Sequence, residues 1–140
     1  MTPTTTPAPA GVARAWPGRP DQLAAARAWA LSLLPAGCPR ADDVALVVGE
    51  LATNAVLHSA SGAPHGTYTL AIAAAAPGSV EITVVDAGPA PVPADRPCGP
   101  GGWGLGIVAA LADAYEVHAG PLGRIAWCRL DWPATPEAGR

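Results

Sequence analysis

The chain has 140 residues, 50% of them hydrophobic and only 14% charged, so one compact domain with a sizeable core is expected. Its formal net charge of -3 provides no broad basic surface, which argues against direct binding of DNA or RNA. All eight basic residues are arginines, and the lack of lysine excludes both a Walker-type phosphate loop and a lysine Schiff base.

The cysteines and the apolar runs indicate a protein that is neither exported nor inserted in a membrane. Cys38, Cys98 and Cys128 are odd in number, and no two stand at the spacing of a zinc or redox motif. Unpaired thiols are typical of a reducing cytoplasm. The first residues lack the apolar region of a signal peptide, and no apolar run approaches the ~20 residues that a membrane span needs. We therefore expect a soluble cytoplasmic protein.

The first half of the chain predicts one strand and two helices. Residues 12–16 fit a short strand. Pro20 suits the first turn of a helix, and apolar residues recur at helical spacing from there until Pro35. Two aspartates then favour the start of a second helix, expected over residues 42–58. The apolar face of that helix consists of Val44, Val47, Val48, Leu51 and Ala55.

The second half predicts two hairpins and a third helix. Alternating apolar residues at 68–72 and 80–84 indicate two strands joined by a turn. The helical spacing of apolar residues predicts the third helix over 104–115. A last strand pair is expected at 116–118 and 122–132.

This mixture of helices and hairpins predicts an α+β fold, a two-layer sandwich in which helices cover one face of a mixed, mainly antiparallel sheet. We expect one domain over residues 11–132, between flexible tails at 1–10 and 133–140 that are rich in Pro, Thr and Ala.

Three polar side chains follow one line along the second predicted helix. Glu50 and Asn54 are four residues apart and share a face, and His58 continues the line one turn further. A buried polar group without a partner costs roughly 1–3 kcal/mol. One interpretation is the solvated face of an amphipathic helix. The other is functional: an amide oxygen helps to hold Mg²⁺ and phosphate, while a carboxylate deprotonates a hydroxyl.

Asp86 ends an apolar strand and is followed by Ala87 and Gly88. A carboxylate at a strand end that faces a cleft can accept a hydrogen bond from an exocyclic amine such as that of adenine. Glycine at the next position but one lets a flat base approach the backbone. The alternative is a plain turn that terminates the strand.

A Pro- and Gly-rich stretch at residues 89–102 leads into the third predicted helix. Such a long stretch inside a compact domain is usually a functional lid or a disordered insertion. Gly102, Gly104 and Gly106 follow, and N–H groups at a helix N-terminus suit phosphate binding. Taken alone this pattern is weak, because no strand leads directly into it as in a dinucleotide-binding motif.

The order of these features resembles the N, G1 and G2 boxes of the Bergerat-fold (GHKL) ATPases, which include DNA gyrase, sensor histidine kinases and anti-sigma-factor kinases. Residues 49–59, GELATNAVLHS, are most similar to the anti-sigma-factor serine/threonine kinase branch, and so are residues 104–113, GLGIVAALAD. Trp127 in the closing strand also suits the small stand-alone versions typical of actinobacteria. The resemblance covers residues 12–132.

The resemblance implies a Mg²⁺-ATP-dependent protein kinase that binds a sigma factor and phosphorylates an antagonist (anti-anti-sigma) protein. Glu50 would be the general base, Asn54 the Mg²⁺ ligand, and Asp86 the residue that reads the adenine amine. Dimers occur in this family, so a homodimer stays open. The implied ATP-binding residues are Asn54, His58, Asp86, Gly88, Gly102, Gly104, Leu105 and Gly106.

Three departures from the family pattern favour an alternative function. Ala90 stands where the G1 box has a second glycine, Trp103 where a basic residue is common, and Ile125 where a threonine often helps to hold the adenine-reading aspartate. The alternative is a non-catalytic regulator that binds a partner protein, with weak or lost nucleotide binding.

Overall fold

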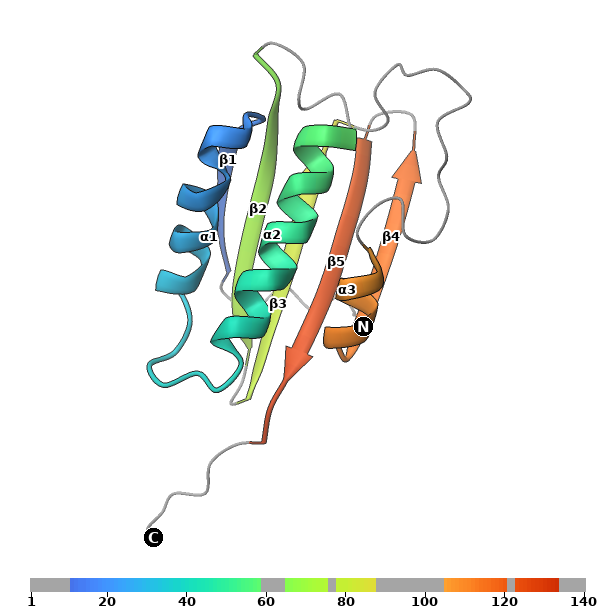
Figure 1. The fold of residues 1–140 in the computed structure, drawn as a ribbon. Coiled ribbons are helices and arrows are strands. Elements are labelled where there is room, and N and C mark those ends of the chain that lie inside the picture. Colours follow the sequence, from blue (N-terminus) through green and yellow to red (C-terminus); the bar gives the residue numbers. More distant parts are fainter. Residues whose placement is uncertain (1–10, 59–64, 76–77, 88–104, 121–122, 134–140) are drawn as a thin grey trace, which may run out of the picture.

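The computed structural model describes residues 11–58, 65–75, 78–87, 105–120 and 123–133. Figure 1 shows how the elements are arranged. In chain order they are β1 (Val12–Pro17), the 3-10 turn η1 (Pro20–Gln22), α1 (Leu23–Ser32), α2 (Ala41–His58), β2 (Thr67–Ala75), β3 (Ser79–Asp86), α3 (Leu105–Leu111), β4 (Ala114–Gly120) and β5 (Gly123–Asp131).

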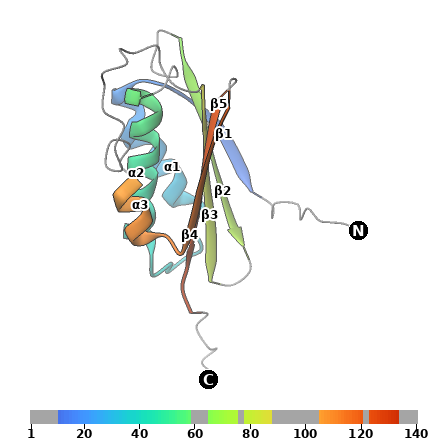
Figure 2. The same cartoon turned by 90° about the vertical axis from the view of Figure 1, so that its right-hand side faces the viewer.

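The described strands form one five-stranded sheet in the order β1-β2-β3-β5-β4. The helices α1, α2 and α3 lie on one side of this sheet, and Figure 2 shows the two layers edge-on. The predicted α+β two-layer sandwich is therefore confirmed. The sheet was expected to be mixed and mainly antiparallel, and each neighbouring pair of its described strands is antiparallel.

The hydrophobic core lies between α2 and the sheet. The predicted apolar face of α2 is buried in full, because its helical spacing turns every member toward the strands. On the sheet, side chains alternate between the two faces. The residues of β3 that point toward the helices are all buried: Val80, Ile82, Val84 and Asp86. Asp86 is thus the charged last member of a row that otherwise belongs to the core.

The third helix is shorter than predicted. α3 ends at Leu111, whereas the apolar spacing extended the helix to Tyr115. The main-chain N–H of Asp113 donates to the carbonyl oxygen of Arg129 at 2.8 Å, and Tyr115 pairs with Cys128 in the β4–β5 ladder. Pairing with β5 therefore draws residues into a strand that local spacing alone assigned to the helix.

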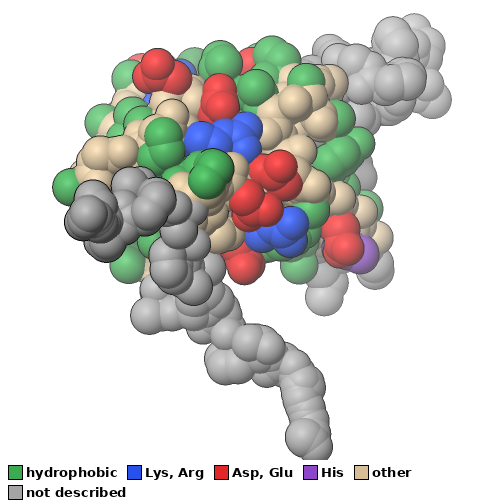
Figure 3. All heavy atoms as spheres, turned by 90° about the horizontal axis from the view of Figure 1, so that it is seen from below, with side chains coloured by type: hydrophobic (Ala, Val, Ile, Leu, Met, Phe, Trp, Pro, Cys, Tyr) green, Lys and Arg blue, Asp and Glu red, His purple; other side chains and the backbone are tan. Residues whose placement is uncertain are grey.

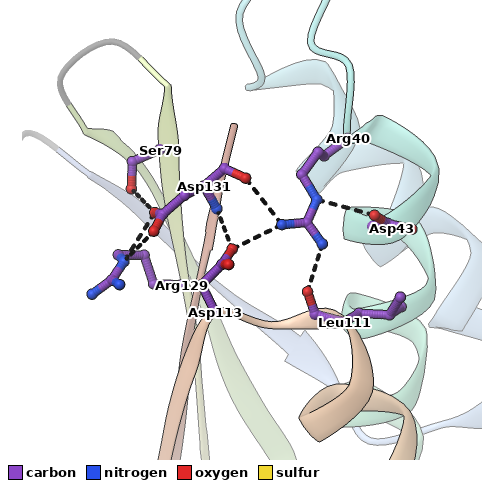
Figure 4. Close-up of polar contacts among 7 residues, drawn as sticks. All are labelled: Arg40, Asp43, Ser79, Leu111, Asp113, Arg129 and Asp131. Carbon is purple, nitrogen blue, oxygen red and sulfur yellow. Dashed lines mark hydrogen bonds and ion pairs between the residues drawn. The ribbon is translucent and has the colours of Figure 1, made fainter. Parts of the chain in front are cut away.

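One arginine connects both layers at the end of the sheet where β5 finishes. The Arg40 guanidinium donates to Asp43 Oδ2 (3.0 Å), Asp113 Oδ2 (2.8 Å) and the carbonyl oxygens of Asp131 (3.0 Å) and Leu111 (Figure 4). The N–H of Asp131 also donates to Asp113 Oδ2 at 2.7 Å. This backbone bond first, and then Arg40, lowers the pKa of Asp113. Arg40 therefore ties the start of α2 to the ends of α3 and β5.

Acidic and basic side chains are interspersed on the face seen from that end of the molecule (Figure 3). Arg40 and Arg129 both form ion pairs with aspartates there. Among the described helices, none combines the length and the apolarity that crossing a membrane requires.

Candidate functional site

Two polar side chains on one flank of α2 have no partner among the described residues. Asn54 is only 7% exposed, and its carboxamide forms no hydrogen bond within the described part of the chain. Glu50, one turn earlier, is half-buried and likewise forms no ion pair or hydrogen bond with a described residue. Among the described residues, the fully buried side-chain polar atoms without a partner are Trp16 Nε1 and Tyr68 Oη, so the carboxamide of Asn54 stays accessible to solvent or to a ligand. His58 ends α2, and its side chain lies outside the described residues.

Asp86 is the other buried polar side chain of the described residues, at 6% exposure. It pairs with Arg124 in the β3–β5 ladder. Both Nε and Nη2 of Arg124 donate to Asp86 Oδ2, at 3.0 and 2.7 Å. Because directly paired residues of antiparallel strands point to the same side, this ion pair lies on the face that the helices cover. The guanidinium compensates a carboxylate charge whose desolvation would otherwise be costly.

Asn54 and Asp86 lie at the same end of the molecule. Asp86 is opposite Arg124, near the start of β5. Figure 1 shows the start of β5 and the last turns of α2 at one end of the two layers. α2 also packs against β3. This placement is compatible with the predicted nucleotide site, and the ATP contacts of these residues stay a prediction.

Most of the predicted glycine contacts cannot be placed, because the corresponding residues are not described. Leu105 begins α3, but its side chain is not described either. Gly106 lies in the first turn of α3, and a Cβ atom added there would meet nothing within 4 Å. The predicted or noted positions outside the described residues are Gly88, Ala90, Gly102, Trp103 and Gly104.

The strand register changes the interpretation of the closing strand. Ile125 was expected at the place where a side chain could hold Asp86, but it pairs with Val85 and is 43% exposed on the opposite face. Arg124 takes that place instead. Its role was not predicted, because a shift of one residue in register exchanges the two faces of a strand. The sequence did contain one indication of such a partner. Asp86 ends an apolar strand at an inward-facing position, and a buried aspartate requires a charged or polar partner.

The donor atoms on this flank fit a hard cation. Mg²⁺ prefers oxygen ligands and keeps several waters, so it needs few protein groups. The amide oxygen of Asn54 and the carboxylate of Glu50 are oxygen donors of this kind. Across the described ranges, this flank included, no group of three or more His, Cys, Asp or Glu side chains could hold a metal ion.

The family model of the histidine kinase-like ATPase domain matches residues 16–130. Among solved structures, the chain is similar to the RsbU and RsbW domains of Rv1364c from Mycobacterium tuberculosis, with a TM-score of 0.68 and 22% sequence identity. That likeness covers 92% of this chain and 34% of the other, so the chain spans about a third of its neighbour's length. At this identity the likeness establishes a common fold. No curated protein matches the sequence significantly.

Proposed function

The chain belongs to the histidine kinase-like ATPase domain family, and we propose that it is a Mg²⁺-ATP-binding regulator of the anti-sigma-factor type. In this proposal it transfers the γ-phosphoryl group of ATP to a serine or threonine of an antagonist protein, and it also binds a sigma factor. Family membership supports nucleotide binding, and residues 49–59 support the anti-sigma-factor branch. A cytoplasmic location and a homodimer are part of the same proposal, whereas contact with nucleic acid or membrane is not.

The observation that carries the proposal is the polar flank of α2. Asn54 is buried, and neither it nor Glu50 has a partner among the described residues. A flank that served only for packing would be apolar, and a flank that served only for solubility would be exposed. A largely buried side chain whose amide is still accessible, next to a half-buried carboxylate, supports a site that is completed by a ligand with oxygen atoms and a cation.

Each residue then has a distinct role. When bound, Mg²⁺-ATP supplies an electrophilic phosphorus atom and a cation that offsets phosphate charge. Asn54 would hold the cation through its amide oxygen. Glu50 would take the proton of the substrate hydroxyl while the oxygen bonds to the γ-phosphorus and ADP leaves. Asp86 would accept a hydrogen bond from the adenine amine, and residues 102–106 would offer N–H groups to the phosphates.

The test separates binding from phosphoryl transfer. Calorimetric titration with Mg²⁺-ATP measures binding, and labelled ATP with candidate antagonist proteins measures transfer. We expect Asn54→Ala to weaken Mg²⁺-dependent binding. Glu50→Gln should bind nucleotide normally but transfer the phosphoryl group roughly 10²- to 10⁴-fold more slowly, because the general base is lost.

Glu116→Gln is the matched control, because Glu116 lies on β4 with an exposed side chain that bonds to His118. This variant should behave as the unmodified protein in both assays. Transfer at the full rate by Glu50→Gln would contradict the base assignment. Failure of the unmodified protein to bind at millimolar Mg²⁺-ATP would contradict the nucleotide proposal as a whole.

A second candidate function is a regulator that binds a partner protein without catalysis. The ion pair between Asp86 and Arg124 favours it, since the carboxylate is already compensated without a nucleotide. Titration and the transfer assay distinguish the two candidates. The second function is selected if the protein binds nucleotide but transfers no phosphoryl group to any antagonist. It is also selected if the protein binds no nucleotide but still binds a partner protein.

A further inference from the structure

The two most exposed large hydrophobic side chains of the described residues both lie on α2. Leu57 is 58% exposed and Leu46 is 50% exposed, whereas Leu51 of the same helix is buried against the sheet at 3%. A single exposed leucine is common on protein surfaces and needs no explanation. These two, however, share a helix with Glu50, the proposed general base.

The two leucines and Glu50 follow one line along α2. Leu46 precedes Glu50 by four residues and Leu57 follows it by seven, spacings that return to the same face of a helix. With a rise of about 1.5 Å per residue, Glu50 stands about 6 Å along the axis from one leucine and about 10 Å from the other. The proposed base therefore lies between two exposed apolar side chains.

This line is on the side of α2 that is turned away from the sheet. In the helical layer α2 lies between α1 and α3 and contacts both (Figure 1). The buried face of α2 packs on the strands, so the opposite side, with Leu46 and Leu57, is open to a partner protein. Packing within the described part of this chain does not account for leucines at these two positions.

The position of Glu50 identifies the occupant of this surface. A general base acts on a hydroxyl that lies within hydrogen-bonding distance. The protein that presents a serine or threonine to Glu50 must therefore lie against the same line of α2, where it meets both leucines. That protein is the antagonist of the proposed reaction.

The charge at one end of the line adds to the description of this partner. Asp42 lies one turn before Leu46, is exposed, and forms no ion pair with a described residue, whereas its neighbour Asp43 is bonded to Arg40. A basic side chain of the partner would be complementary to Asp42. The partner surface that fits α2 is therefore apolar around the acceptor hydroxyl and basic at the end near Asp42.

We propose that Leu46 and Leu57 dock the antagonist protein and select a segment whose acceptor serine or threonine lies between apolar side chains, with a basic residue opposite Asp42. This inference rests on the proposed kinase function and adds the residues that determine which hydroxyl reaches Glu50. Contacts of the two leucines are made equally before and during phosphoryl transfer, so they lower the KM for the antagonist without changing kcat.

The probe is the antagonist protein that the unmodified chain phosphorylates with labelled ATP. Leu46→Ala and Leu57→Ala should each raise the KM for this protein roughly tenfold, because each removes most of one leucine side chain from the contact. Both should leave kcat and the calorimetric affinity for Mg²⁺-ATP unchanged. Alanine favours the helix and both positions are exposed, so both variants should fold. Asp42→Asn should raise the KM roughly threefold at low ionic strength and less in high salt.

Val12→Ala is the matched control, because Val12 is 47% exposed but lies on β1 at the edge of the sheet. It should leave the KM unchanged. An unchanged KM in either leucine variant would overturn the inference, and so would a loss of kcat or of nucleotide affinity in place of the rise in KM. An unchanged KM in Asp42→Asn would refute the basic residue of the partner. If the unmodified protein transfers phosphate to no antagonist, the proposed function fails together with the inference.

Discussion

Replacing Arg40 with alanine should destabilise the fold markedly, because this side chain bonds to four segments and is only 19% exposed. Its carboxylate partners, Asp43 and Asp113, are 35% and 43% exposed, so solvent screens both ion pairs. The main contribution comes from the bonds to the carbonyl oxygens of Leu111 and Asp131. At about 1 kcal/mol or slightly more for each of these, Arg40→Ala should lower the free energy of unfolding by about 2–3 kcal/mol.

Urea denaturation followed by circular dichroism measures this change. With a slope of about 1–3 kcal/mol per molar urea for a small domain, the midpoint should fall by roughly 1–2 M. Arg40→Lys should recover less than half of the loss, because a single ammonium group cannot reach acceptors that a planar guanidinium spans.

Arg19→Ala is the control for the arginine series. Arg19 bonds to Asp21 at 2.6 Å, but both side chains are largely exposed, so we expect a change of no more than about 0.5 kcal/mol. If Arg40→Ala and Arg19→Ala had equal effects, Arg40 would be another surface arginine, and its proposed role in joining the two layers would be refuted.

Two further predictions concern the sheet. Burial raises the pKa of the Cys128 thiol from 9.0 to about 12. Above pH 9 only the unfolded thiol ionises, so the free energy of unfolding should fall by about 1.4 kcal/mol for each pH unit. The unfolded thiol passes through its midpoint between pH 8 and 10, so thermal unfolding of Cys38→Ala should show a total loss of about 1.4 kcal/mol over this range. Cys128→Ala should show a much smaller loss, and equal losses in both variants would contradict the prediction. Gly123→Ala should destabilise by roughly 1–3 kcal/mol through its clash with Asp86. Gly106→Ala, which meets nothing, should be neutral or stabilising in the same urea assay.

The helices and strands that could be predicted from the sequence are those indicated by the spacing of apolar residues close together in the chain. The period of the apolar residues in α2 and β3 indicated which faces are buried, and the structure agrees for both. The same periodicity made Asn54 and Asp86 conspicuous, because each interrupts an apolar pattern at a position that faces inward. The nucleotide contacts inferred from those residues stay predictions.

The errors arose where the outcome depended on partners distant in the chain. Local spacing extended the third helix into residues that β5 draws into β4. The family resemblance, in turn, pointed to Ile125 rather than Arg124 as the neighbour of Asp86. In both cases the choice depended on how β5 aligns with a neighbouring strand, and a strand's own sequence does not specify that alignment.

The sequence by itself determined the two layers, the inward faces of their elements and the polar residues that interrupt those faces, because a side chain's direction follows from its place in a helix or strand. Only the tertiary structure decided that Arg124 holds Asp86 and that Arg40 joins α2, α3 and β5. These contacts join residues 38 to 91 positions apart, and strand register together with helix packing brings such residues within hydrogen-bonding distance.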